Sequence, residues 1–289
     1  MSTDRLLGSS GISVRRIGLG GMPMSIQGRP GEARSLATLR AAFDEGFDFV
    51  DTADVYCLDD RDLGHNERLI ARALRDHPRG SEVFVATKGG CTRPNGRWEV
   101  DGRPAHLEAA CDRSLVALGV DCITLYQLHA PDDRVRFEDS VGALARLREV
   151  GKVAHVGLSN VSVAQIRKAS AIVPIVSVQN RLNPYDRRSI ESGVLAHCEA
   201  HGIAFLAYSP VGGRRGIERL AADPALTAVG ARLGASAPEV ALAWLLATSP
   251  VTIPIPGASK PESARSSARA ESLALGPADL AELDRAFSQ

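Results

Sequence analysis

The chain has 289 residues, and its 34 Lys and Arg residues balance its 34 Asp and Glu residues, so the formal net charge is zero. This balance leaves no strongly basic face and argues against nucleic acid or an anionic membrane as a partner, which leaves small molecules or other proteins. Barrels and other large α/β folds reach this length as one domain, so we expect a single domain over residues 1–289.

The amino-terminal sequence has no basic segment followed by a long apolar one, and no later run approaches about eighteen apolar residues. We therefore expect a soluble cytoplasmic protein that has no membrane partner. The five cysteines are an odd number without a C-x-x-C pair, which favours reduced thiols over a disulfide or zinc framework. Apart from His129, the histidines show no spacing typical of a metal site, so no metal is expected.

Short apolar or β-branched runs alternate with helical patterns along the chain. Residues 5–20, RLLGSSGISVRRIGLG, indicate a hairpin with SSG at its turn, leading into the first strand. The strand-like runs lie within residues 15–20, 47–53, 82–90, 122–132, 153–161, 174–181, 203–213 and 251–259. The helical patterns cover residues 32–46, 66–77, 104–120, 137–152, 162–172, 189–202, about 222–248 and 261–270, and a terminal helix begins near residue 276.

Eight strand runs, each followed by a helical pattern, predict a (β/α)8 TIM barrel of parallel strands with the N-terminal hairpin and the C-terminal helix added. The strands lack polar alternation, as expected when both faces of a sheet are covered. The hairpin would cap the amino-terminal mouth. The rival is a doubly wound sheet, but its G-x-G-x-x-G fingerprint is missing, because Gly18, Gly20 and Gly21 have the wrong spacing.

Polar residues of unusual type follow three consecutive strands at their carboxyl ends, where barrels carry their chemistry. The second run ends in VDTADVY with Asp51 and Tyr56, the third in VATKGG with Lys88, and the fourth in LYQLHAPD with His129. A carboxylate buried without a partner costs several kcal/mol of solvation, so we expect Asp51 to pair with Lys88 one strand away.

These side chains are suited to proton transfer. A phenol has a pKa of about 10, so Tyr56 needs a nearby cation such as Lys88 to stabilise its phenolate. His129 can hydrogen-bond an incoming carbonyl oxygen or share the proton.

At this point the sequence resembles the aldo-keto reductase family over nearly the whole chain. Besides the three motifs above, the resemblance includes GHNERLIARAL, RSLVALGVD, VAHVGLSN, VSVQNR, IAFLAYSPVGG, ALAWLLATSP and IPIPGASKPE, in this order. It implies a proton donor at Tyr56, a supporting lysine at Lys88, its paired aspartate at Asp51 and a carbonyl-orienting histidine at His129.

The resemblance also implies a nicotinamide cofactor, held extended in the barrel mouth without a Rossmann domain. Ser159, Asn160 and Gln179 would hold the carboxamide, Tyr208 would stack on the nicotinamide ring, and the turn Ser209–Gly213, with Pro210 and Gly212, would approach the pyrophosphate. The loop Gly257–Lys260, with Ala258 and Ser259, would meet the adenosine phosphate.

The GASK segment supports that last assignment on physical grounds, since it offers backbone N–H groups, a hydroxyl and an ammonium just before a helix. Lys260 favours NADPH over NADH without excluding NADH. Many relatives have an arginine at the position of Ser263, and an acid and an asparagine at the positions of Ser266 and Ser267. Part of the usual set of residues that bind the adenosine phosphate is therefore absent. Arg265 or Arg269 would then compensate.

Two residues near the proposed proton donor have open interpretations. Cys57, where the family commonly has glycine, either lines the substrate pocket or is a small tolerated residue. Trp98, in the loop after the third strand, either contacts substrate or anchors the loop. Asp54 is expected to shape its loop.

The sequence therefore predicts reversible NADPH-dependent reduction of a small-molecule aldehyde or ketone. One alternative is a regulatory module that binds the nucleotide, senses its redox state and turns over little. A barrel isomerase or lyase that needs no nicotinamide is the second.

Overall fold

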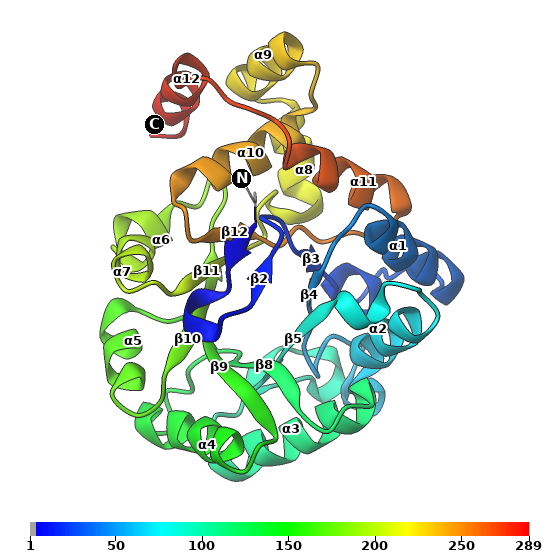
Figure 1. Ribbon diagram of the computed structural model, residues 1–289, viewed down its shortest axis with the longest axis vertical. Helices are drawn as coiled ribbons and strands as arrows, with labels where there is room; N and C mark the ends of the chain where they lie inside the picture. Colours follow the sequence, from blue (N-terminus) through cyan, green and yellow to red (C-terminus); the bar gives the residue numbers. More distant parts are fainter. Residues whose placement is uncertain (1–3, 289) are drawn as a thin grey trace.

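The computed structural model describes residues 4–288 and contains a barrel of parallel strands surrounded by helices (Figure 1). In order around the sheet the strands are β3 (Leu19–Gly20), β4 (Phe49–Asp51), β5 (Phe84–Gly89), β8 (Ile123–Leu128), β9 (Val153–Ser159), β10 (Ile175–Arg181), β11 (Ala204–Tyr208) and β12 (Thr252–Pro254). Backbone hydrogen bonds from Gly18 to Pro254 (3.0 Å) and from Gly20 to Pro256 (2.9 Å) join the first strand to the last. The predicted (β/α)8 fold is confirmed, whereas the single domain over residues 1–289 stays a prediction.

The helices follow the strands nearly as expected. They are α1 (Glu32–Asp44), α2 (His65–Arg75), α3 (Pro104–Leu118), α4 (Phe137–Glu149), α5 (Val163–Ser170), α6 (Arg188–Glu191), α7 (Val194–Ala200), α8 (Gly213–Ala221), α9 (Pro224–Leu233), α10 (Ala237–Thr248), α11 (Pro261–Ala270) and α12 (Pro277–Phe287). The region expected as one helical stretch near 222–248 is two helices, since Gly234 ends α9 in a left-handed conformation and Ser236 starts α10 with a capping box.

The hairpin of β1 (Arg5–Leu6) and β2 (Ser13–Val14) lies across the barrel in Figure 1. Leu7 and Val14 are fully buried among residues that begin the barrel strands, including Phe49 and Val176. Gly8 permits this approach, because a Cβ at that position would lie 2.1 Å from the carbonyl oxygen of Val176. The hairpin thus closes the amino-terminal mouth, and ligands have access to the carboxyl ends of the strands.

A second hairpin, of β6 (Cys91–Thr92) and β7 (Glu99–Val100), occupies the segment 91–103 that the sequence indicated only as a loop. Strands of two residues carry no detectable periodicity, which is why the pattern missed them. The hairpin follows β5 directly and therefore places Trp98 beside the carboxyl end of the barrel.

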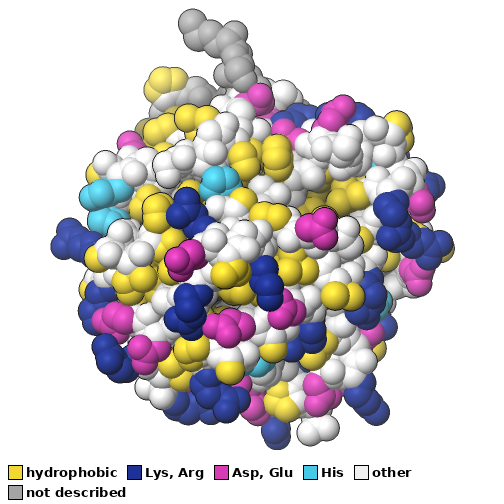
Figure 2. Space-filling model, turned by 60° about the horizontal axis from the view of Figure 1, so that its bottom comes forward, with side chains coloured by type: hydrophobic (Ala, Val, Ile, Leu, Met, Phe, Trp, Pro, Cys, Tyr) yellow, Lys and Arg dark blue, Asp and Glu magenta, His cyan; other side chains and the backbone are white. Residues whose placement is uncertain are grey.

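No helix within residues 4–288 is long and apolar enough to cross a membrane. On the face shown in Figure 2, basic and acidic side chains are intermixed rather than gathered by sign, in keeping with the zero net charge.

Candidate active site

Lys88 is the centre of the candidate site and is completely buried in β5. Its ammonium donates to Asp51 Oδ2 (2.6 Å), to the carbonyl oxygen of Thr52 (2.8 Å) and to Tyr56 Oη (3.0 Å). An ammonium has three donors, so all of them are used. The structure therefore brings together Asp51, Lys88 and Tyr56 as the sequence predicted.

The second oxygen of Asp51 is also satisfied. Its Oδ1 accepts from Gln179 Nε2 at 2.7 Å and from Gln127 Nε2 at 3.3 Å. Gln127 was missed by the sequence reasoning, although a glutamine inside the apolar run of β8 was a detectable signal. Because β4, β5, β8 and β10 each supply one of these side chains, the barrel itself fixes the position of the ion pair.

Burial and charge act in opposite directions on these groups. Burial lowers the pKa of Lys88, but Asp51 and Tyr56 raise it more, so the net pKa is raised and the ammonium persists at neutral pH. Burial raises the pKa of Tyr56 to about 12, although the charge of Lys88 opposes this. In this state the lysine does not make the phenol acidic; Tyr56 is a protonated donor.

His129 directly follows β8, and its backbone N–H donates to the carbonyl oxygen of Gly89 (2.9 Å). Its half-buried ring lies 5.8 Å from the ring of Tyr56, at an interplanar angle of 79°. Burial and then the charge of Lys88 lower the pKa of His129 well below 6.5, so the ring is neutral. A neutral imidazole has one N–H to donate and one nitrogen that accepts.

The two pocket candidates differ in exposure. Trp98 is 48% exposed, with its ring 6.3 Å from that of Tyr56 and 6.1 Å from that of His129. Cys57 has no exposed surface, and its thiol donates to the carbonyl oxygen of Val55 at 3.3 Å. Burial raises the pKa of this thiol to about 12. The geometry thus places Trp98 at the mouth and favours the packing interpretation for Cys57.

The residues assigned to the nicotinamide surround Asn160, which adopts a left-handed conformation (φ 59°). Its Nδ2 donates to the carbonyl oxygen of His129 (3.0 Å) and to Ser159 Oγ (3.1 Å), and its Oδ1 accepts from Tyr208 Oη (2.8 Å). These contacts place Ser159, Asn160 and Tyr208 beside the proton-transfer residues. Gln179 lies in the same region, because its side chain donates a hydrogen bond to Asp51.

Two helices begin at the loops assigned to phosphate groups. Helix α8 starts at Gly213 after Ser209, Pro210 and Gly212, and α11 starts after Lys260; neither has a side-chain cap. Uncapped helix starts present free N–H groups and a favourable dipole to an anion. Packing also favours glycine at position 257, since a Cβ there would lie 2.6 Å from Pro23 Cγ.

Some side chains near the proposed adenosine phosphate site already make contacts with other residues of the protein. Arg269 Nη2 pairs with Glu239 Oε1 at 2.7 Å, and Ser266 Oγ donates to the same oxygen at 2.9 Å. These contacts argue against Arg269 as the compensating residue. Arg265 lies 3.7 Å from Glu45 and is half-exposed, so it stays free to turn, whereas Ser267 is buried on α11.

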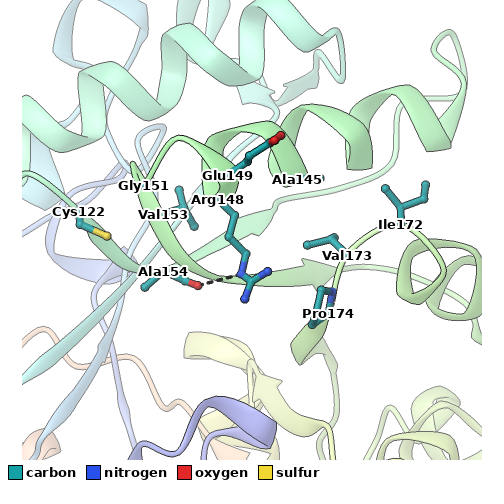
Figure 3. Close-up of a pocket in the computed structure, with 10 residues that line it drawn as sticks. All are labelled: Cys122, Ala145, Arg148, Glu149, Gly151, Val153, Ala154, Ile172, Val173 and Pro174. Atoms are coloured by element: carbon teal, nitrogen blue, oxygen red, sulfur yellow. Dashed lines mark hydrogen bonds between the residues drawn. The ribbon is translucent and has the colours of Figure 1, made fainter.

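A surface depression of about 620 Å³ lies away from this site (Figure 3). Its lining includes Cys122, Gly151 and Pro174, which precede strands β8, β9 and β10, so it is at the amino-terminal end of the barrel. Arg148 extends into it and donates to the carbonyl oxygen of Ala154 at 3.2 Å. Among residues 4–288 no group of three or more His, Cys, Asp or Glu side chains is arranged to hold a metal ion.

Comparison with known proteins identifies the family. Residues 16–287 match the model of the aldo/keto reductase family. The chain belongs to this family. A curated relative, the uncharacterized oxidoreductase C215.11c of Schizosaccharomyces pombe, is 35% identical over 279 residues, which are 94% of this chain and 86% of the relative. This aldo/keto reductase is therefore an oxidoreductase.

Solved structures show the same fold. The glycerol dehydrogenase AKR11B4 from Gluconobacter oxydans is 27% identical and has a TM-score of 0.85, covering 100% of this chain and 96% of its own. An aldo/keto reductase from Klebsiella pneumoniae, solved with NADP and acetate, is 24% identical and has a TM-score of 0.81, covering 98% and 95%.

Proposed function

We propose that this aldo/keto reductase reduces an aldehyde or ketone to the alcohol with NADPH, reversibly, and that Tyr56 donates the proton to the carbonyl oxygen. The observation that carries the proposal is the buried ammonium of Lys88, which contacts both Tyr56 Oη and Asp51. A lysine held in this way stabilises the charge that forms on the tyrosine when its proton leaves. We further propose a cytoplasmic location and a small carbonyl compound as the substrate.

The mouth of the barrel fits a nicotinamide nucleotide, since it offers uncapped helix starts at α8 and α11 for phosphate groups. When bound, the cofactor supplies the hydride that reduces the carbonyl carbon. The residues proposed to hold it are Ser159, Asn160, Gln179 and Tyr208 at the nicotinamide, Ser209, Pro210 and Gly212 at the pyrophosphate, and Gly257, Ala258, Ser259, Lys260, Arg265 and Ser267 at the adenosine phosphate. Lys260 supports NADPH over NADH.

The chain's own residues then carry out the proton transfer. Neutral His129 donates a hydrogen bond that orients the carbonyl oxygen toward Tyr56. As negative charge develops on that oxygen, Tyr56 gives up its proton, and the Lys88 ammonium, already 3.0 Å from Oη, stabilises the phenolate. Asp51 keeps the ammonium charged and fixed in place. In alcohol oxidation, Tyr56 acts as the base instead.

The test is a Tyr56→Phe variant studied by NADPH titration and by a single-turnover trace with a reactive aryl aldehyde. We expect cofactor affinity within about twofold of the parent and a fall in turnover of about 10³-fold or more, because the proton donor is gone. Near-normal turnover by the variant would overturn the assignment. If the parent bound NADPH but did not oxidise it with any of a range of carbonyls, the regulatory alternative would replace the enzyme.

A further inference from the structure

The aromatic rings at the mouth form a three-sided corner. Tyr56, His129 and Trp98 lie 5.8, 6.1 and 6.3 Å apart by ring centroid, and every pair is close to perpendicular, at 79°, 74° and 73°. Two of the walls belong to the proposed proton-transfer machinery. The third, Trp98, comes from the hairpin of β6 and β7 and has no catalytic chemistry of its own.

Arg93, from the same hairpin, lies under Trp98. Its guanidinium carbon is 4.2 Å from the centroid of the indole ring, and the residue is only 1% exposed although Trp98 is 48% exposed. Since Arg93 covers one side of the indole, the exposed surface of Trp98 lies on its other sides. A guanidinium stacked on an indole and shielded from water is a favourable cation–π contact.

Hydrogen bonds fix Arg93 to two other loops of the mouth. Its Nη2 donates to Gln27 Oε1 (2.7 Å) and, at 3.3 Å each, to the carbonyl oxygens of Cys57 and Leu58. Gln27 Nε2 also donates to the Leu58 carbonyl oxygen at 2.8 Å. The loops after β3, β4 and β5 therefore meet at this one side chain.

The other two nitrogens of Arg93 lie outside this hydrogen-bond network. Nε and Nη1 are buried and have no hydrogen-bond partner within the described chain. The hydrogen bonds of Nη2 hold the guanidinium in place, and the stack on Trp98 is the contact made by its face. Arg93 therefore links the position of the indole to three loops of the mouth.

We propose that Arg93 is a positioning residue that holds Trp98 as the third wall of the carbonyl corner, and that this wall selects carbonyls carrying a flat apolar group, such as aryl aldehydes. The inference rests on the proposed function. Seated with its oxygen at Tyr56 and His129, such a substrate lays its flat group along the indole. A small aliphatic aldehyde makes no use of this wall.

The experiment compares benzaldehyde with propanal in the Arg93→Met, Arg93→Lys and Trp98→Ala variants and in the Arg93→Met/Trp98→Ala double variant. We expect Arg93→Met to lower kcat/KM for benzaldehyde by about tenfold, mainly through KM, and to change propanal by less than about twofold. Arg93→Lys should recover only part of the loss, because lysine lacks the planar fork. The matched control is Arg97→Met, whose side chain is 71% exposed and pairs with Glu99 at 3.2 Å.

The double variant decides between positioning and a general structural role. If Arg93 acts through Trp98, adding Arg93→Met to Trp98→Ala causes no further loss of benzaldehyde selectivity. Equal losses for both aldehydes, or additive losses in the double variant, would overturn the proposal. Propanal turnover that survives in every variant shows that the proposed function stands even if the inference fails. No turnover of either aldehyde by the parent would show instead that the proposed function is wrong.

Fluorescence gives a readout that does not require activity. Trp98 and Trp244 are the only two tryptophans, and Trp244 is 2% exposed. Acrylamide quenching therefore reports mainly on Trp98. We expect stronger quenching in Arg93→Met than in Arg97→Met, because the covered side of the indole opens; unchanged quenching would contradict the proposed stack.

Discussion

Asp51 and Asp54 lie three residues apart and are equally buried, at 2% and 1% exposure, yet their surroundings differ completely. Asp51 contacts Lys88 at 2.6 Å and two glutamine amides. Within the described chain Asp54 has no side-chain hydrogen-bond partner comparable to these, and its nearest cation, Arg113, is 3.7 Å away. Burial alone therefore does not distinguish the two carboxylates; a fixed counter-charge in direct contact does.

The largest effect should come from removing that counter-charge. In a Lys88→Met variant we expect carbonyl reduction to fall by about 10³-fold or more, since Tyr56 loses the cation that stabilises its phenolate. Asp51 would be left buried and uncompensated, which should lower the free energy of unfolding by about 3 to 5 kcal/mol. Steady-state kinetics and urea unfolding measure the two effects.

The matched control is Lys168→Met, which removes a surface ion pair with Glu138 (3.0 Å). We expect little change in either measurement, because exposed ion pairs contribute little. Equal destabilisation by the two substitutions would contradict the distinction between a buried, fully hydrogen-bonded ion pair and a solvated one.

The sequence was sufficient for the barrel and for the proximity of Asp51, Tyr56, Lys88 and His129, because parallel strands bring their carboxyl ends to one rim. It was insufficient for features that depend on contacts between residues far apart in the sequence. Nothing in the local pattern near Arg93 shows that its guanidinium will stack on Trp98 and join three loops. Nor does the pattern show that burial outweighs Lys88 and raises the pKa of Tyr56.

A smaller effect is expected when the pH is changed, and it depends on the protonation states of His129 and Tyr56. The pKa of His129 is well below 6.5 and that of Tyr56 about 12, so neither group titrates near neutrality. We expect kcat/KM for carbonyl reduction to vary by less than about twofold between pH 6.5 and 9, whereas alcohol oxidation, which needs the phenolate, should rise by up to about tenfold per pH unit. Stopped-flow pH profiles in both directions provide the measurement. An inflection near pH 6.5 that His129→Gln abolishes would show instead that the histidine is charged during reduction.

The smallest effect concerns Asp54. Burial, and then the charge of Glu67, raise its pKa well above 3.8, so the folded protein binds this proton more tightly than the unfolded chain does. The contribution to stability is therefore fully present below pH 3.8 and is lost as pH rises through the folded pKa. We expect Asp54→Asn, which cannot ionise, to be more stable than the parent by about 1 to 2 kcal/mol at pH 8 and to lose that advantage toward pH 4. Urea unfolding across this range tests the sign, with kcat expected to stay within about threefold of the parent. A variant less stable than the parent at pH 8 would show that the Arg113 contact, despite its 3.7 Å length, gives Asp54 the compensation that Lys88 gives Asp51.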